Sequence, residues 1–425
     1  MRVEEQAGRA RQASYRLATL STEVKNRALE SAARALEGHG REILAGNLKD
    51  QEQARKLGLK DALLKRLILS EGKLTQIVES VREVVRLPDP VGRRLLVREL
   101  DDGLVLTKLT VPIGVIGVIF ESRPDALVQI ASLGLKSGNA VILKGGSEAR
   151  LSNRILFTLI REAVEAADPA FRDALQLVET REDVRQLLAL DQLIDLMIPR
   201  GSGELVKSIQ ENTRIPVLGH AEGLCHLYVD RDAELSMAVE LAYDAKCQYP
   251  AVCNAIETLL IHGEVAPQFL PRLAARLRGV ELRGDARTRA IIPAREVAEA
   301  DWRAEYNDLI LAIRVVSCLE EAVAHINRYG SHHTDAIVTS DSAAARRFLA
   351  EVDSASVMWN CSTRFADGYR YGLGAEVGIS TGKVHARGPV GLEGLTSTKY
   401  VLEGSGQVVA DYAEGRRRFT HRELA

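Results

Sequence analysis

The chain has 425 residues, of which 46% are hydrophobic and 27% are charged, and its formal net charge is -2. This balance is typical of a globular protein, and the length predicts two or three domains. A chain this close to neutral has no general attraction to nucleic acid or to anionic membranes. The N-terminus is charged, no apolar run approaches the roughly 18 residues of a membrane span, and the cysteines lack framework spacing. We therefore expect a soluble cytoplasmic protein with reduced thiols.

Residues 3–87 have helical periodicity, and prolines at 88 and 90 end that stretch. Two strand-like runs then flank Asp102-Gly103, a dipeptide typical of hairpin turns. This hairpin, residues 93–111, has no evident core, and neither has a strand pair predicted at 400–409. Because small strand pairs are marginal alone, we expect both to pack across subunits in a homo-oligomer. The basic run 416–418 is expected to be solvated.

From Gly114 onward, short runs of Val, Ile and Leu alternate with longer amphipathic runs, which is typical of βαβ units. The alternation predicts an α/β fold with two consecutive Rossmann-like parallel-sheet domains. We place the helical N-terminus and a nucleotide-binding domain at 1–222, a second domain at 223–385, and a C-terminal arm and tail at 386–425. The hairpin and the arm would form a small β element for oligomerisation.

Small residues, cations and helix starts gather where the predicted strands of the first domain end. These carboxyl ends meet at one edge of an open parallel sheet, where ligands bind. The helices that follow offer unpaired N–H groups and positive dipole ends, which suit a pyrophosphate. Lys144 would add a cation close to Gly146 and Ser147, and Gly201-Ser202 follows another strand. No Gly-x-Gly-x-x-Gly is present, so the prediction of a nucleotide site depends on several strand ends together.

Cys253 lies between a Gln-Tyr-Pro turn and a strand-like run that begins near Thr258. Free cysteines are most often buried structural residues. At such a junction, however, a thiol can meet a substrate while backbone N–H groups point at the same place. That arrangement suits acyl transfer through a thioester, in which a thiolate attacks and an amide receives the oxyanion. We therefore expect Cys253 to be a nucleophile whose thiolate forms near neutral pH, assisted by a helix terminus or a cation.

Several long stretches together resemble the aldehyde dehydrogenase superfamily and, within it, the γ-glutamyl phosphate reductase family (glutamate-5-semialdehyde dehydrogenases). They are residues 114–125, 138–149, 220–226, 252–258 and 362–395. The resemblance implies NADPH-dependent reduction of L-glutamyl 5-phosphate to L-glutamate 5-semialdehyde, with release of phosphate, in proline biosynthesis. It also implies a glutamate kinase as the source of the acyl phosphate.

The resemblance also implies roles for individual residues. Cys253 falls on the superfamily's nucleophile, and Glu305 falls on a carboxylate that holds the nicotinamide ribose. Lys144 falls where the family holds the adenosine ribose. The residues assigned to NADP(H) are Lys144, Gly146, Ser147, Gly201, Ser202 and Glu305, and no metal is implied. The residues alone do not decide between NADPH and NADH, because Glu148 would repel a 2′-phosphate that Arg150 and Arg154 could receive.

The chain departs from hydrolytic aldehyde dehydrogenases in one respect that bears on the substrate. Those enzymes carry an oxyanion-hole Asn near position 123, where this chain has an Arg, whose guanidinium suits phosphate oxygens. Glu222 falls near the general base that activates water, but release of phosphate involves no hydrolytic step, so it is left out of the catalytic set. For an anionic substrate we expect contacts with Arg123, Arg364, Lys383 and His385.

Three other functions were weighed against this interpretation. A non-phosphorylating aldehyde dehydrogenase would need the oxyanion Asn and a water-activating carboxylate. A catalytically silent scaffold or binding protein of the same fold is disfavoured by the intact Cys253, Lys144 and Glu305. A metalloenzyme built on the histidines at 325, 332 and 333 is disfavoured because adjacent histidines seldom present both rings to one metal.

Overall fold

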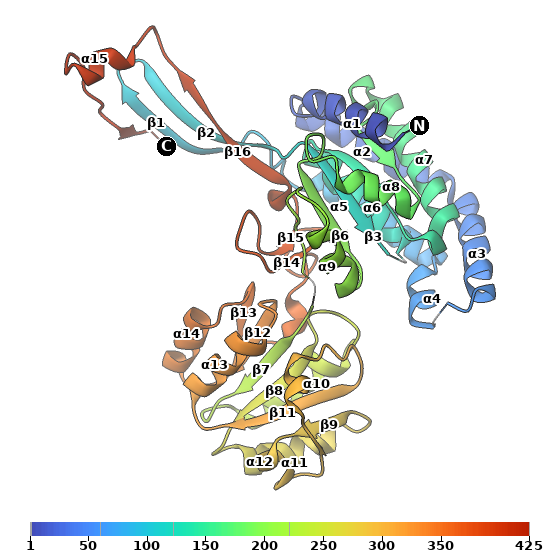
Figure 1. Cartoon of the computed structure of the whole chain (residues 1–425), viewed down its shortest axis with the longest axis vertical. Coiled ribbons are helices and arrows are strands. Elements are labelled where there is room, and N and C mark those ends of the chain that lie inside the picture. The colour runs from blue at the N-terminus through green and yellow to red at the C-terminus, as the bar shows by residue number, and fades with distance from the viewer. Residues whose placement is uncertain (1, 60, 122, 221, 425) are drawn as a thin grey trace.

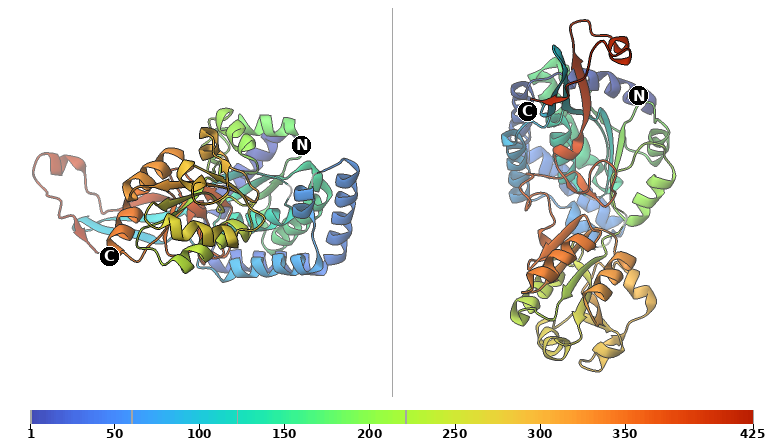
Figure 2. Two further views of the ribbon diagram at one scale, coloured as in Figure 1. Left: turned by 90° about the horizontal axis from the view of Figure 1, so that it is seen from below. Right: turned by 90° about the vertical axis from the view of Figure 1, so that its left-hand side faces the viewer.

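The computed structural model describes residues 2–59, 61–121, 123–220 and 222–424. The chain forms two α/β regions and a β arm, and the arm projects from the first region (Figure 1). In the side view of Figure 2 the arm and the second region lie at opposite ends of an elongated molecule. No helix in the described ranges is long and apolar enough to cross a membrane.

The first α/β region contains a four-stranded parallel sheet in the order β5-β4-β3-β6. Every residue of β3 is buried, as expected for a strand with helices on both faces of its sheet. The strands are β3 (Val115–Phe120), β4 (Ala140–Lys144), β5 (Leu175–Leu177) and β6 (Leu196–Arg200). The helices are α1 (Val3–Leu17), α2 (Thr22–Gly38), α3 (Gly40–Lys56), α4 (Asp61–Leu67), α5 (Glu71–Arg86), α6 (Pro124–Lys136), α7 (Arg150–Ala167), α8 (Arg181–Leu188) and α9 (Gly203–Glu211).

Local sequence explains why helices begin just after these strands. Thr180 forms a capping box with Asp183 at the start of α8, and the Ser202 hydroxyl accepts from the Leu205 N–H at the start of α9. Pro124 stands in the first turn of α6, where its missing N–H costs no hydrogen bond. The helix starts therefore face the edge formed by the strand ends.

The second α/β region contains a seven-stranded sheet in the order β10-β9-β11-β8-β7-β12-β13, with all neighbours parallel. Its strands are β7 (Cys225–Val229), β8 (Ile256–His262), β9 (Glu281–Gly284), β10 (Arg295–Glu296), β11 (Ile310–Val316), β12 (Thr334–Val338) and β13 (Ser356–Trp359). Its helices are α10 (Leu235–Cys247), α11 (Ala266–Arg276), α12 (Ala286–Arg289), α13 (Leu319–Tyr329) and α14 (Ser342–Glu351). The predicted α/β class and parallel sheets are confirmed. Sequence periodicity missed β9, β10 and β13, which are short and lie towards the sheet edges.

The arm is an antiparallel sheet in the order β16-β2-β1-β17, with strands β1 (Arg94–Asp101), β2 (Leu104–Pro112), β16 (Thr396–Glu403) and β17 (Arg422–Glu423). The predicted hairpin is confirmed. The predicted strand pair at 400–409 is wrong, because β16 pairs with the free edge of β2 and Val409 begins the short helix α15 (Val409–Ala413). The basic run is not a free tail either, since the Arg417 Nε lies 2.8 Å from the Asp101 Oδ2.

The segment between the second region and the arm returns to the first region. Its short strands β14 (Gly378–Ser380) and β15 (Gly388–Val390) pair antiparallel. Asn139 ties this segment down, since its Nδ2 donates to the Leu395 carbonyl at 2.8 Å. Five apolar residues of the segment belong to the hydrophobic core of the first region: Ala375, Val377, Val390, Leu392 and Leu395. Residues near 376 are thereby brought to the ends of the strands of the first sheet.

Candidate active site

Cys253 lies in the turn between α10 and β8, at the amino end of the second sheet. Gly223 packs directly on it, since a Cβ at position 223 would lie 2.3 Å from the Cys253 carbonyl oxygen and 2.5 Å from its Cα. The Cys225 Sγ donates to the same carbonyl at 3.1 Å. Because β7 and β8 are neighbours, the segment that leads into β7 contacts the turn before β8 and holds in place the turn that carries the thiol.

Glu305 lies in the loop before β11, and its Oε1 accepts from the Gly223 N–H at 3.0 Å. The carboxylate is thus attached to the backbone that packs on Cys253. Burial raises the pKa of Glu305, the Gly223 N–H opposes this shift, and the nearby Glu222 adds to it. The structure therefore brings Glu305 and the thiol together, as a contact between the nicotinamide end of a cofactor and the nucleophile would require.

The charges around Cys253 do not favour its thiolate. Burial is the main cause that raises its pKa, to about 12, and the carboxylates of Glu376 and Glu305 add to the shift. Arg364 lowers the pKa of Cys253, but by less. The expectation of a thiolate near neutral pH is therefore wrong for this structure, because desolvation and two carboxylates outweigh the Cys253 backbone N–H and the Arg364 guanidinium, which lower the pKa.

We expect alkylation of Cys253 by iodoacetamide to accelerate with pH without levelling off near neutrality. Only the thiolate reacts, and below the pKa its fraction rises about tenfold per pH unit. With a pKa of about 12, the rate should still climb between about pH 7 and pH 10. Rate constants from peptide mass spectrometry check this, with the unfolded protein as a control that levels off near about 8.5. A plateau in the native protein below about pH 8 would contradict the burial argument.

Arg200, which the sequence analysis did not single out, is a cation beside the thiol. It ends β6, and its Nη1 is buried and has no hydrogen-bond partner within the described part of the chain. Burial and nearby Arg123 lower the pKa of Arg200, whereas Glu376 and Cys253 oppose that shift, so these groups share one neighbourhood. An unpaired buried N–H costs free energy that a bound anion would recover. Its place at a strand end, before Gly201, is the signal that could have revealed it.

The four side chains expected to contact the substrate fall into two places. Arg123 pairs with Asp125 at 3.0 Å and Arg364 donates to Gln248 at 3.0 Å, and each interacts electrostatically with the surroundings of Cys253. Lys383 instead pairs with Asp353 at 2.7 Å, and the His385 Nε2 lies 2.8 Å from the Gly394 carbonyl. Among the described residues, neither of these two forms a hydrogen bond or ion pair with Cys253, Arg123 or Arg364.

Apart from Glu305, the residues assigned to the cofactor lie at the carboxyl ends of β4 and β6, which flank β3. Burial lowers the pKa of Lys144 at the end of β4. The Glu121 Oε2 accepts from the Ser202 N–H at 3.0 Å, so an anionic group already stands at the start of α9. A small pocket at this edge is lined by Gly145, Gly146, Ser147, Arg150, Asn153, Leu177, Val178 and Glu179. Lys144 and Arg150 are the cations at this edge that could hold the phosphates or a ribose of a dinucleotide.

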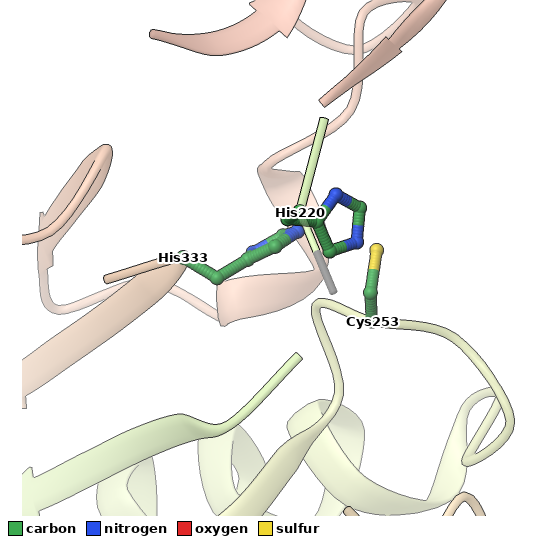
Figure 3. A group of neighbouring side chains, drawn as sticks. All are labelled: His220, Cys253 and His333. Carbon is green, nitrogen blue, oxygen red and sulfur yellow. The ribbon is translucent and has the colours of Figure 1, made fainter. Parts of the chain in front are cut away.

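Two histidines lie beside the thiol. The ligand atoms of His220, Cys253 and His333 all lie within 4.8 Å of one another (Figure 3). Of His325, His332 and His333, the possible metal ligands in the sequence, only His333 lies beside the thiol. His325 contacts Arg314 at 2.9 Å, and the His332 Nδ1 lies 2.6 Å from the Asp353 carbonyl.

Three features define the class of protein: two parallel-sheet regions, a cysteine in the turn at the amino end of the second sheet, and polar residues at the carboxyl ends of the strands of the first sheet. A sequence profile of the aldehyde dehydrogenase family matches residues 1–306. The chain therefore belongs to the aldehyde dehydrogenase family, and within it to the group of γ-glutamyl phosphate reductases. It is 57% identical over 426 residues to the γ-glutamyl phosphate reductase of Pelotomaculum thermopropionicum, which covers 100% of this chain and 98% of the relative.

Solved structures agree with this assignment. A crystal structure of γ-glutamyl phosphate reductase from Thermotoga maritima matches with a TM-score of 0.93 and 40% identity, over 96% of this chain and all (100%) of that chain. A glyceraldehyde-3-phosphate dehydrogenase from Methanocaldococcus jannaschii, complexed with NADP, matches with a TM-score of 0.69 and 13% identity, over 95% of this chain and 94% of that one. The second likeness extends to the fold alone.

Proposed function

We propose that the protein reduces L-glutamyl 5-phosphate to L-glutamate 5-semialdehyde with NADPH and releases phosphate, as a step of proline biosynthesis. The observation that carries the proposal is a pair of interacting guanidinium groups: Arg200, which interacts with Cys253, and Arg123, which interacts with Arg200. An acyl phosphate brings a dianionic leaving group to this place, whereas a hydrolytic enzyme needs a neutral oxyanion donor there. The names of the relatives at 52–57% identity support the same substrate.

In the proposed reaction the Cys253 sulfur attacks the γ-carbonyl and phosphate leaves towards Arg200 and Arg123. The thiol proton has an acceptor close by. The His220 Nδ1 donates to the Ile379 carbonyl at 2.9 Å, so its Nε2 carries a lone pair, and burial lowers its pKa and keeps the ring neutral. The Cys253 backbone N–H would stabilise the oxyanion. When bound, NADPH would supply hydride to the thioester carbon. The C–S bond then breaks, which releases the semialdehyde, and the Cys253 sulfur takes up a proton again.

We assign NADP(H) to the edge of the first sheet at which its strands end, within residues 1–222. The nucleophile lies within residues 223–385. Arg150 lines the pocket beside Ser147 and is the cation that would receive a 2′-phosphate. Arg154 is less suited, because its Nε and Nη2 both pair with Glu179 at 2.5 Å. Glu305 would hold the nicotinamide ribose, next to the thiol.

Phosphate dependence of the reverse reaction is the experiment that tests the proposed function. We expect oxidation of glutamate semialdehyde by NADP+ to require phosphate or arsenate, because an oxyanion must open the thioester where no water-activating carboxylate acts. Initial rates are measured in a non-phosphate buffer with and without added phosphate. Equal rates would identify a hydrolytic aldehyde dehydrogenase and overturn the proposal.

We propose that the arm joins subunits of a homo-oligomer. It extends away from the rest of the chain (Figure 1), and β16 and β1 carry exposed apolar side chains: Leu95, Tyr400 and Leu402. A free sheet of this kind is a site for pairing with another copy. Light scattering of the full chain at micromolar concentration should therefore give a dimer or larger assembly, and a monomer would refute this expectation.

A further inference from the structure

The three groups in Figure 3 come from loops that the sheet topology brings together. His220 precedes β7, Cys253 precedes β8 and His333 precedes β12, and β7 lies between β8 and β12 in the sheet. Because all three strands are parallel, their amino ends meet at one edge. The two imidazoles and the thiol converge there, with all their ligand atoms within 4.8 Å of one another.

Both histidines can offer a nitrogen lone pair. The His333 side chain is only 1% exposed, and its Nε2 is buried without a hydrogen-bond partner among the described residues. Its Nδ1 lies 2.9 Å from the Thr334 hydroxyl, which can accept the ring proton and leave Nε2 bare. Burial lowers the pKa of His333 well below its usual value, so the ring is neutral. The His220 Nε2 is bare because its Nδ1 donates to a carbonyl.

We propose that His220 Nε2, His333 Nε2 and Cys253 Sγ form an inhibitory site for a thiophilic divalent cation such as Zn²⁺. Two imidazoles and one thiolate with an open fourth position are a ligand set that zinc binds. Zinc–ligand bonds of about 2.0–2.3 Å place tetrahedral ligand atoms roughly 3.3–3.6 Å apart. A closure of about 1 Å from the observed arrangement, through side-chain rotation, would give that geometry. That the site inhibits depends on the proposed role of Cys253 as nucleophile.

Binding exchanges a proton for the metal and involves no oxidation. The Cys253 thiol gives its proton to solvent as the metal binds, because the thiolate is the ligand. The sulfur electron pair then forms the bond to Zn²⁺, and the neutral histidines release no proton. One proton should therefore leave for each ion bound. The captured sulfur can neither attack an acyl phosphate nor react with an alkylating agent.

Calorimetric titration of the full-length, metal-free protein with Zn²⁺, in two buffers of different ionisation enthalpy, tests the site. We expect one ion and one released proton per chain near neutral pH, and protection of Cys253 from iodoacetamide. His333→Asn should weaken Zn²⁺ binding by about tenfold or more, since even groups behind the ligands contribute 10–100-fold. The metal-free alkylation rate should stay within about twofold of wild type, because His333 does not touch the reacting atoms in the proposed mechanism.

His332→Asn is the matched control, because it removes the adjacent ring, which lies outside the trio, and should bind Zn²⁺ as wild type does. Circular dichroism and thermal unfolding show whether His333→Asn folds. If it does not, His220→Asn replaces it in the Zn²⁺ titration alone, with the same expected loss of affinity, because His220 also accepts the thiol proton in the proposed mechanism. Equal Zn²⁺ affinity in wild type and in a folded His333 or His220 variant, or no proton release, would overturn the site. None of these measurements uses substrate, so their outcome does not depend on whether oxidation of the semialdehyde requires phosphate.

Discussion

Replacing Cys253 by serine should abolish turnover while leaving the fold intact. A serine hydroxyl fits the turn between α10 and β8 at nearly the same volume, but it is a far weaker nucleophile than sulfur. Burial lowers the pKa of the neighbouring His220, so this ring is a weak base for a hydroxyl. The turn itself is fixed by Gly223 and Cys225 through the backbone of residue 253, which the substitution keeps. We expect kcat to fall by at least about three orders of magnitude with an unchanged melting temperature.

Cys247→Ser and Cys361→Ser are the controls, because both thiols are partly buried, and burial raises the pKa of each. Both variants should keep most of the activity. Cys225→Ser, which the sequence alone would place with these controls, is not a neutral change, since the Cys225 Sγ donates to the Cys253 carbonyl. Substantial turnover by Cys253→Ser would remove the nucleophile from the mechanism.

Gly223→Ala should reduce kcat by about a hundredfold with a smaller change in stability. The added methyl group would lie 2.3–2.7 Å from the Cys253 backbone and Cβ, and backbone atoms cannot rotate away as a flexible side chain can. The turn that carries the thiol must move, and a displacement near 1 Å from productive geometry costs about that factor. The same shift would disturb the hydrogen bond from Gly223 to Glu305. Steady-state kinetics and calorimetric unfolding measure the two effects.

Gly8→Ala is the matched control for this substitution. Gly8 lies inside α1, where an added Cβ meets no atom within 4 Å. Alanine there should leave kcat unchanged and stabilise the helix by about 0.5–1 kcal/mol. If Gly223→Ala behaved as Gly8→Ala does, close packing on Cys253 would have no part in positioning the thiol.

The sequence predicted those elements whose signal is local. The alternating runs gave β3, β4 and β8, and Asp102-Gly103 gave the hairpin, because hydrophobic periodicity and turn chemistry act over a few residues. The wrong prediction of a strand pair at 400–409 arises because the pairing of this segment is not local. The partner of β16 is β2, which lies in a distant part of the chain, so residues near 400 do not reveal how they pair.

The residues of the candidate site also divide into those that local motifs predict and those that they do not. The family motifs around Cys253 and Lys144 are local, and the structure places both residues at strand junctions. The groups that set the chemistry around the thiol come from distant parts of the chain, as Glu376 and Arg200 do. The sign of the Cys253 pKa shift depends on burial and on the balance of these charges, and neither is a property of any one stretch of sequence.

The arm has a consequence for how the chain is made. Its hairpin is synthesised early, but both outer strands belong to the last part of the chain, and Gln407 bonds the Asp102 carbonyl across 305 residues. At translation rates of about 5–20 residues per second, the nascent hairpin waits roughly 15–60 s before β16 emerges from the ribosome. Throughout that interval both of its edges are open to pairing with another nascent chain. The arm therefore closes only after residues 396–423 have been synthesised.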